Sequence, residues 1–232
     1  MRVFISGATG YIGQRVSRML IDRGHSVTAL VRAASAKKLP QGCTPVIGDA
    51  INATSFAERV APAGTFVHLV GVSHPSPWKE REFREVDLAS VHASVEAAAK
   101  SGIKHFVYVS VAQPAPVMKA YLRVRAECEA VISRSGISAT ILRPWYVLGP
   151  GHWWPVALVP FYRLLERMPS KRETALRLGL VTIQEMIAAL VWAVENPVAG
   201  VRIISVPEIR QAAALLRLGQ GGDAATPATA AR

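Results

Sequence analysis

Short apolar runs alternate with longer stretches in which apolar residues recur at helical spacing. The runs that predict strands are residues 3–5, 26–31, 45–47, 66–70, 105–110 and 139–142. The stretches that predict helices are residues 11–23, a short one near 54–60, a long one near 80–100, and 118–135. This alternation predicts an α/β fold: a doubly wound parallel sheet with right-handed crossovers and helices on both faces.

The pattern loosens after Pro144, where Gly149-Pro150-Gly151 interrupts it. An apolar segment at 156–165, a strand at 178–183, a helix at 184–195 and a last strand at 201–206 follow. From about residue 219 the chain is Gly, Ala, Thr and Pro, which predicts a disordered tail. We therefore expect one domain over residues 1–206, with a small C-terminal lobe from about 145, and a C-terminal helix and tail over 207–232.

A glycine-rich turn joins the first predicted strand to the first predicted helix. It reads Gly-Ala-Thr-Gly-Tyr-Ile-Gly over residues 7–13. Gly7 permits a sharp turn, Gly10 lets the backbone approach a phosphate, and Gly13 allows close packing of the helix. The helix start adds free N–H groups and the positive end of the helix dipole. Strand, turn and helix together predict a dinucleotide site of the Rossmann type.

Composition and charge narrow the classes of function. The net charge is +11, but the basic residues are scattered and lack interleaved aromatic side chains, so we do not expect nucleic-acid binding as the main function. Cys43 and Cys128 have no metal or disulfide spacing, and the histidines are unclustered, so no metal site is expected. No signal peptide and no apolar run of ~18 residues is found, which predicts a soluble cytoplasmic protein without a transmembrane segment.

A set of motifs then appears in a fixed order along the chain. It comprises the glycine turn, Leu30-Val31-Arg32, Gly48-Asp49, His68-Leu69-Val70-Gly71, Tyr108-Val109-Ser110, Tyr121, and Arg143-Pro144 followed by Trp145 to Gly151. Over about residues 1–206 the chain resembles the short-chain dehydrogenase/reductase superfamily, in its extended or atypical branch of epimerase-like and NmrA-like NAD(P)-binding proteins. It is also similar to the nucleotide-binding accessory subunit of respiratory complex I, a member of that branch not known as an enzyme.

Together, the glycine turn and the resemblance imply the set of residues that hold the cofactor. They are Gly7, Thr9, Gly10, Tyr11, Ile12, Gly13, Arg32, Asp49, Ala50, Val70, Gly71, Tyr121 and Pro144. Arg32 ends the second strand where an acid would bind the ribose of NAD, so we expect NADP, with Lys37 and Lys38 nearby; the alternative is a solvated loop cation. Asp49 matches the family residue that binds the adenine amine, or it caps a turn.

The resemblance also implies the catalytic residues Ser110, Tyr121 and Arg125. In the family a Ser orients the reacting carbonyl or hydroxyl, a Tyr exchanges its proton, and a Lys four residues later lowers the Tyr pKa and holds the ribose. Here that Lys is replaced by Arg125, which shares a helical face with Tyr121 but is a planar fork in place of a compact ammonium. Tyr121 could instead be a packing residue and Arg125 a surface cation. His68, inside a strand, is expected to be a hydrogen-bonded core residue.

The aromatic residues after Pro144, together with Arg125, leave two possible functions open. Trp145, Tyr146, Trp153 and Trp154 stand where the family has its substrate lip, and they line an apolar pocket or pack the small lobe. The chain is then an NADP-dependent oxidoreductase or epimerase-like enzyme for a small, partly apolar carbonyl or alcohol. Alternatively, it is a non-catalytic NADP(H)-binding sensor or interaction module with an unknown partner. We favour the second hypothesis because of Arg125.

Overall fold

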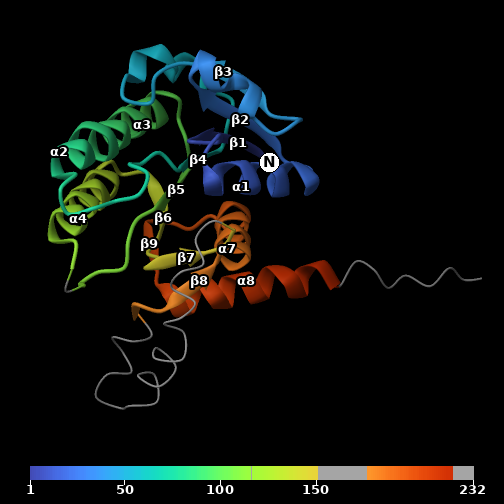
Figure 1. Ribbon diagram of the computed structural model, residues 1–232. Helices are drawn as coiled ribbons and strands as arrows, with labels where there is room; N and C mark the ends of the chain where they lie inside the picture. The colour runs from blue at the N-terminus through green and yellow to red at the C-terminus, as the bar shows by residue number, and fades with distance from the viewer. Residues whose placement is uncertain (116, 151–176, 222–232) are drawn as a thin grey trace, which may run out of the picture.

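The computed structural model describes residues 1–115, 117–150 and 177–221. Its strands are β1 (Arg2–Ser6), β2 (Ser26–Val31), β3 (Thr44–Ile47), β4 (Thr65–His68), β5 (His105–Val109), β6 (Ser138–Leu142), β7 (Tyr146–Leu148), β8 (Leu180–Thr182) and β9 (Val201–Ile204). A seven-stranded parallel sheet has the order β3-β2-β1-β4-β5-β6-β9 (Figure 1). The strand order reverses between β1 and β4, so the predicted doubly wound parallel sheet is confirmed.

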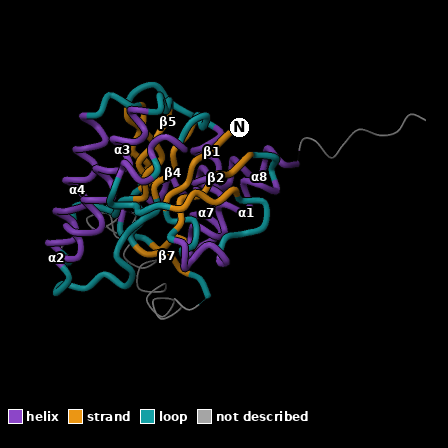
Figure 2. The backbone as a smooth tube through the Cα atoms, turned by 90° about the horizontal axis from the view of Figure 1, so that it is seen from above, coloured by secondary structure: helices purple, strands orange, loops and turns teal. Residues whose placement is uncertain are grey.

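Helices cover both faces of this sheet. They are α1 (Tyr11–Asp22), α2 (Glu80–Glu82), α3 (Ala89–Lys100), α4 (Lys119–Arg134), α7 (Ile183–Glu195) and α8 (Val206–Gly221), with a π-helical segment η4 (Phe83–Leu88) between α2 and α3. The 3₁₀ turns are η1 (Ala33–Lys38), η2 (Ala53–Ser55) and η3 (Ala57–Arg59), so two short turns stand where one short helix was expected. α1, α7 and α8 pack on one face, and α3 and α4 on the other (Figure 2).

The central strands are apolar on both faces because both faces are covered. Phe4, Phe66 and Phe106 occupy neighbouring positions on β1, β4 and β5, and their rings form a row under α3 and α4. The ring centroids lie 5.0 Å apart for Phe4 and Phe66 and 5.2 Å apart for Phe66 and Phe106. Sheets buried in this way are read from sequence as continuous apolar runs, which is how these strands were predicted.

The C-terminal part of the chain completes the main sheet. β9 pairs with β6, and α7 begins at a capping box in which Thr182 and Glu185 exchange hydrogen bonds. α8 adds Ile209, Ala212 and Leu216 to the core on the α1 face, and it runs through Gly221, past the point where the tail was expected to begin. β7 and β8 form a separate two-stranded sheet. β7 was not predicted because it is only a three-residue strand.

Candidate functional site

The three glycines of the turn after β1 have different surroundings. Gly7 has a φ of +84°, and a Cβ there would lie 2.7 Å from the Leu69 backbone. A Cβ on Gly13 would lie 2.1 Å from the Gly7 carbonyl oxygen, so Gly13 lets α1 pack against the turn. A Cβ on Gly10 would meet only the Gly7 oxygen, at 3.3 Å. Gly7 and Gly13 therefore serve the fold, whereas Gly10 borders open space.

A cavity of about 630 Å³ lies over this turn, at the carboxyl ends of the central strands. Its walls are the glycine turn, residues 69–75 after β4, the end of β5, α4, and the segment 145–147 around β7. The predicted site residues that line it are Gly7, Gly10, Tyr11, Ile12, Gly13, Val70, Gly71, Ser110, Tyr121 and Arg125. The cavity lies where the strand order reverses, the usual position for a ligand in a doubly wound sheet.

Arg125 forms part of the cavity wall, and its guanidinium is held by protein groups. Its Nη1 donates to the Tyr108 hydroxyl at 2.9 Å and to the Val109 carbonyl oxygen at 3.0 Å. Its Nη2 lies 3.6 Å from Oδ1 of Asp87. Burial lowers the pKa of Arg125, but Tyr108, Tyr121 and Asp87 together raise it well above its usual value, so the group stays charged. The alternative that Arg125 is a surface cation is wrong, because the side chain is buried.

Asp87, on η4, completes this cluster, and no motif in the sequence pointed to it. Its Oδ1 accepts the Val72 N–H at 2.8 Å, whereas Oδ2 and the Arg125 Nε have no hydrogen-bond partner within the part of the chain that the structure describes. Burial raises the pKa of Asp87 against the opposing effects of Arg125 and the Val72 N–H. A Cβ on Gly71 would lie 2.6 Å from Arg125 Nη2 and 2.9 Å from Asp87 Oδ1. Gly71 thus brings the cavity wall directly against the pair.

Ser110 lies beside a second buried carboxylate. Its hydroxyl donates to Oε1 of Glu129 at 2.5 Å. Arg143 holds the same carboxylate, with Nε 3.0 Å from Oε1 and Nη2 2.5 Å from Oε2, and Gln113 Nε2 donates to Oε1 at 2.9 Å. The sequence analysis missed Glu129. The available signal was its spacing, because Tyr121, Arg125 and Glu129 recur every fourth residue and so share one face of α4.

Tyr121 contributes its ring to the cavity wall. The ring centroid lies 4.9 Å from that of Phe83, and Arg125 Cζ lies 5.0 Å from the Tyr121 centroid. The cation therefore meets the face of the ring, an attractive arrangement for an aromatic side chain. These contacts agree with the packing role considered for Tyr121, and its role in proton exchange stays a prediction.

His68 is the core histidine that its position in a strand suggested. Its Nδ1 lies 3.0 Å from the Ser6 and Ser94 hydroxyl oxygens, and Nε2 lies 3.4 Å from that of Ser90. Burial, together with the charge of Arg125, lowers the pKa of His68 to about 3. The imidazole is thus neutral at neutral pH, and it supports the floor of the site without facing the cavity.

A family profile described as NAD(P)H-binding matches residues 7–150, which include the glycine turn, β5 and α4. The chain belongs to this NAD(P)H-binding family. The likeness to solved structures agrees: WbmH of Bordetella bronchiseptica, in complex with NAD+, covers 97% of this chain at 19% identity with a TM-score of 0.66, and the match spans 83% of that chain. UDP-glucuronic acid 4-epimerase of Bacillus cereus, in complex with NAD, covers 88% of this chain at 17% identity and a TM-score of 0.64, over 77% of its own. The chain therefore has the fold of these NAD-bound proteins, as the resemblance implied.

Curated relatives of this NAD(P)H-binding protein differ in their roles. Ceramide reductase of Caulobacter vibrioides is 24% identical over 90% of this chain and 65% of its own length. The 3-diazoavenalumate denitrifying reductase of a Streptomyces species is 27% identical over 86% of this chain and 74% of its own. The photosystem II assembly factor Ycf39 of Synechocystis is 30% identical over 62% of this chain and 44% of its own. The chain thus spans 65% of the first of these relatives and less than half of the last.

The glycine turn fits the pyrophosphate of an NAD(P) nucleotide. Gly10 is the N-cap of α1 and makes no side-chain hydrogen bond there, and the first turn of α1 carries no acidic residue. The helix start therefore offers backbone N–H groups to an anion, and no Cβ fills the space above Gly10. Open space at Gly10 and an acid-free helix start are what the pyrophosphate of the family's cofactor requires.

Arg32 and Asp49 follow β2 and β3 at the same edge of the sheet as the glycine turn. Both are exposed. The Arg32 side chain makes no hydrogen bond to cap η1, for which Arg32 is the N-cap residue. Asp49 Oδ1 accepts the Ile51 N–H at 3.2 Å, so the turn-capping role considered for Asp49 is present. Their contacts with a cofactor stay predictions, as does the choice between NAD and NADP.

Like Arg32 and Asp49, three further predicted cofactor residues lie outside the cavity wall. Thr9 accepts a hydrogen bond from Gln14 through its carbonyl oxygen, and Pro144 accepts one from the Ala112 N–H. Ala50 packs against the hydrophobic core on the α3 face. Among the tryptophans and tyrosines expected at the substrate lip, Trp145 and Tyr146 line the cavity, while Trp153 and Trp154 lie outside the described residues.

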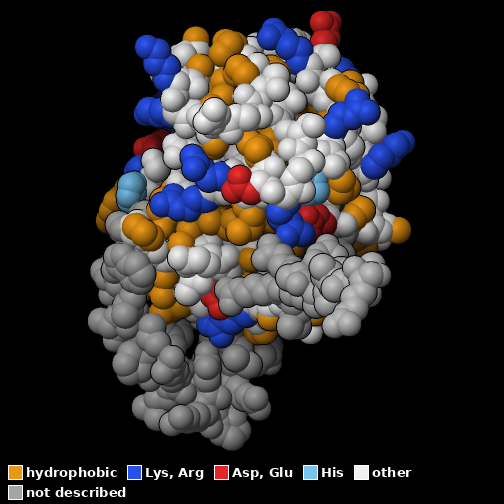
Figure 3. Space-filling model, turned by 90° about the vertical axis from the view of Figure 1, so that its right-hand side faces the viewer, with side chains coloured by type: hydrophobic (Ala, Val, Ile, Leu, Met, Phe, Trp, Pro, Cys, Tyr) orange, Lys and Arg blue, Asp and Glu red, His pale blue; other side chains and the backbone are white. Residues whose placement is uncertain are grey.

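The rest of the described surface carries few features that point to other ligands. On the face shown in Figure 3, Lys and Arg side chains are spread over the surface with acidic side chains among them. No group of three or more His, Cys, Asp or Glu residues suited to a metal occurs in residues 1–115, 117–150 and 177–221. None of the helices described there is long and apolar enough to cross a membrane.

Proposed function

We propose that this protein binds NADP(H) in the cavity, with the glycine turn at the pyrophosphate, and that it prefers the phosphorylated nucleotide. Arg32 supports this preference because its exposed guanidinium stands where an acid would select NAD. Lys37 and Lys38 add positive charge in η1. A charge-assisted hydrogen bond contributes ~1.5–3 kcal/mol, which corresponds to a ten- to hundredfold preference for NADPH over NADH.

Fluorescence titration with NADPH and NADH tests this preference. Arg32→Ala is expected to weaken NADPH binding ten- to a hundredfold, by the ~1.5–3 kcal/mol given above, and to leave NADH binding unchanged. Arg18→Ala is the matched control, because Arg18 is an exposed cation of α1 away from the cavity wall. Equal affinities for the two nucleotides, or a preference that survives Arg32→Ala, would contradict the proposal.

Gly10 provides a separate test of where the nucleotide lies. Gly10→Val places a side chain in the open space of the cavity and meets only the Gly7 oxygen, so the variant is expected to fold and to lose nucleotide binding. Gly64→Val is the control, because a Cβ there meets nothing within 4 Å and Gly64 lies outside the cavity wall. Normal NADPH binding by a folded Gly10→Val protein would show that the turn has been misread.

We propose further that the nucleotide is held as a signal or as part of an interaction module, and is not turned over. The observation that carries this proposal is that Ser110 and Arg125, the other two residues of the predicted catalytic set, are already hydrogen-bonded to protein groups. The Arg125 guanidinium is bonded to Tyr108 and Val109, and the Ser110 hydroxyl is bonded to Glu129. Neither group extends freely toward a reacting oxygen.

An oxidation assay with NADPH and a broad panel of carbonyl compounds tests this second step. We expect the unaltered protein, Tyr121→Phe and Arg125→Lys all to bind NADPH and none to oxidise it. Rapid NADPH oxidation by the unaltered protein that is lost in Tyr121→Phe would contradict the non-catalytic role and would show that Arg125 replaces the family's lysine in catalysis.

A second candidate function is supported by the names of the relatives. Two of those described above are reductases, and the cavity extends past Tyr121 to Trp145 and Tyr146. The chain would then be an NADP-dependent oxidoreductase or epimerase-like enzyme for a small, partly apolar carbonyl or alcohol. A bound nicotinamide supplies or accepts the hydride in such reactions. Under this alternative Arg125→Lys raises turnover, because it restores the compact ammonium.

The cellular location is part of the same proposal. Cys43 and Cys128 are both free thiols, which supports a reducing, cytoplasmic compartment. Cell fractionation with an antibody against the protein tests this, and recovery in an oxidising compartment would contradict it.

A further inference from the structure

The Glu129 carboxylate beside the cavity faces four hydrogen-bond donors. It receives hydrogen bonds from the Ser110 hydroxyl at 2.5 Å, Gln113 Nε2 at 2.9 Å, and Arg143 Nε and Nη2 at 3.0 and 2.5 Å. Three of these donors converge on Oε1, which shares its two lone pairs among them, and one binds Oε2. Glu129 is buried.

This arrangement fixes the direction of the Ser110 proton. Oε1 already accepts from Gln113 and from the Arg143 guanidinium, so the Ser110 hydroxyl joins it as a donor. The Ser110 hydroxyl has a single proton, and it is used in the hydrogen bond to Glu129. The remaining lone pairs of Ser110 Oγ are the part of the group left for the cavity, whose wall Ser110 forms.

We infer that Glu129 is the positioning residue of this site: it holds the Ser110 proton away from the cavity, so that Ser110 meets a second ligand as a hydrogen-bond acceptor. The ligand class that fits is one with an O–H or amide N–H at this point, such as an alcohol. A carbonyl oxygen in the same place would face lone pairs and gain no hydrogen bond. The inference rests on the proposed function, because it places that ligand in the nucleotide cavity.

The variant that tests it must release Ser110 without leaving a buried charge. Glu129→Met with Arg143→Met removes both partners of the ion pair, and replacement of such a pair by apolar residues of similar volume is often tolerated. The matched control is Arg23→Met with Glu195→Met. That pair is also bidentate, at 2.7 and 2.8 Å, and it lies away from the cavity wall.

Two probes of the same shape report the hydrogen-bond direction, 1-phenylethanol and acetophenone. The alcohol is titrated with NADPH bound and the ketone with NADP+ bound, so no turnover is possible in either mixture. Ligand-observed NMR gives the two dissociation constants and their ratio. We expect the unaltered protein and the control pair to favour the alcohol, and the Glu129/Arg143 double variant to shift the ratio about tenfold toward the ketone.

Ser110→Ala identifies the group through which the ratio changes. Added to the double variant, it is expected to abolish the shift, since no hydroxyl then remains to donate. An unchanged ratio in the folded double variant, a shift that survives Ser110→Ala, or binding of neither probe to any of these proteins overturns the inference. Failure of NADP(H) to bind would instead contradict the proposed function, and the same titrations without nucleotide would still decide the role of Glu129.

Discussion

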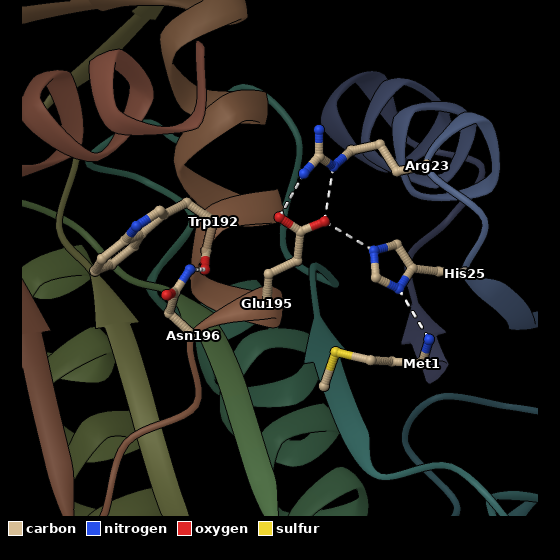
Figure 4. A network of polar contacts seen from close by, with 6 residues as sticks. All are labelled: Met1, Arg23, His25, Trp192, Glu195 and Asn196. Carbon is tan, nitrogen blue, oxygen red and sulfur yellow. Dashed lines mark hydrogen bonds and ion pairs between the residues drawn. The ribbon is translucent and has the colours of Figure 1, made fainter. Parts of the chain in front are cut away.

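Two arginine–carboxylate pairs at opposite edges of the sheet differ in how completely they are hydrogen-bonded. At the amino edge, Arg23 grips Glu195 with two hydrogen bonds of 2.7 and 2.8 Å, and His25 adds a third at 2.9 Å (Figure 4). At the carboxyl edge, Arg125 and Asp87 are 3.6 Å apart, and each retains a buried polar atom without a partner in the described chain. The better-bonded pair is the one far from the cavity.

The difference shows what each pair is for. The Glu195 pair ties the end of α7 to the end of α1 and is partly exposed, so it joins two elements at small cost in desolvation. The Asp87 pair is buried, and each unsatisfied group there costs about 1–3 kcal/mol. Such a pair contributes little to stability, whereas it fixes the wall beneath Gly71.

The pKa shifts separate the pairs in the same way. Burial raises the pKa of Asp87, and neither Arg125 nor the Val72 N–H fully offsets it. Burial also raises the pKa of Glu195, but the hydrogen bonds from Arg23 and His25 outweigh that effect and lower it on balance. Ionised Glu195 therefore stabilises the fold, while ionised Asp87 is held at a cost.

The largest expected effect is the removal of Asp87. Asp87→Leu leaves the Arg125 charge buried without its counter-ion, which costs about 3–5 kcal/mol of unfolding free energy. Glu195→Leu leaves a partly exposed arginine and costs about 1 kcal/mol. Denaturant unfolding at pH 7 measures both. Equal losses would break the comparison, because the two pairs would then contribute alike.

The next effect concerns the buried histidine below the site. The pKa of His68 is lowered from 6.5 to about 3, so between these pH values the unfolded chain binds a proton that the folded chain does not. Stability is expected to fall as pH falls through this window, by up to about 1.4 kcal/mol per pH unit. His68→Asn removes this contribution to the slope.

His105, at the amino edge, is the matched control for that measurement. Its pKa is lowered to about 4, by burial first and then by Arg202. His105→Asn is expected to flatten the acid slope only above about pH 4, so unfolding curves at closely spaced pH values distinguish the two histidines. Identical profiles would mean that the two edges do not differ in this respect.

A smaller effect is expected at Glu195 itself. The pKa of the Glu195 carboxyl is lower in the folded protein than in the unfolded chain. Its contribution to the unfolding free energy is therefore present above the unfolded-state pKa and is lost as pH falls through the folded-state pKa. Glu195→Gln is expected to cost about 1 kcal/mol at neutral pH and progressively less in acid. NADPH affinity should not change, and a change there would couple the two edges.

The smallest effect is expected on the outer face of α4. Arg123 pairs with Glu80 at 2.9 Å, and both side chains are exposed. Arg123→Ala is expected to change the unfolding free energy by less than about 0.5 kcal/mol. Thermal unfolding of the variant beside the unaltered protein measures this, and a large loss would show that exposed pairs matter more here than the comparison implies.

Most of the fold could be predicted from the sequence because the patterns that indicate strands, helices and turns are local. Apolar runs and a glycine turn are read residue by residue, and they located the central strands and the nucleotide turn. β7 was not predicted because three residues are too few to show a periodic pattern. The segment after residue 54 formed 3₁₀ turns because the tertiary packing of Phe56 overrides a weak helical pattern.

The site was predictable only in part, for a different reason. Ser110, Tyr121 and Arg125 follow a motif and do meet at one cavity. Asp87 and Glu129 matter through the groups that they face, which come from distant segments of the chain, and no spacing rule reports such a meeting. Only the four-residue interval from Arg125 to Glu129 left a trace in the sequence.

That interval has a mechanical consequence. Tyr121, Arg125 and Glu129 lie on one face of α4, so a small rotation of the helix about its axis would move a ring, a cation and a carboxylate together. On the opposite side of α4, Arg123 forms an ion pair with Glu80 of α2, and Glu127 forms one with Arg84 of η4. The two exposed ion pairs and the three cavity groups therefore lie on opposite sides of one helix, so a shift of α4 at either pair would move all three groups together.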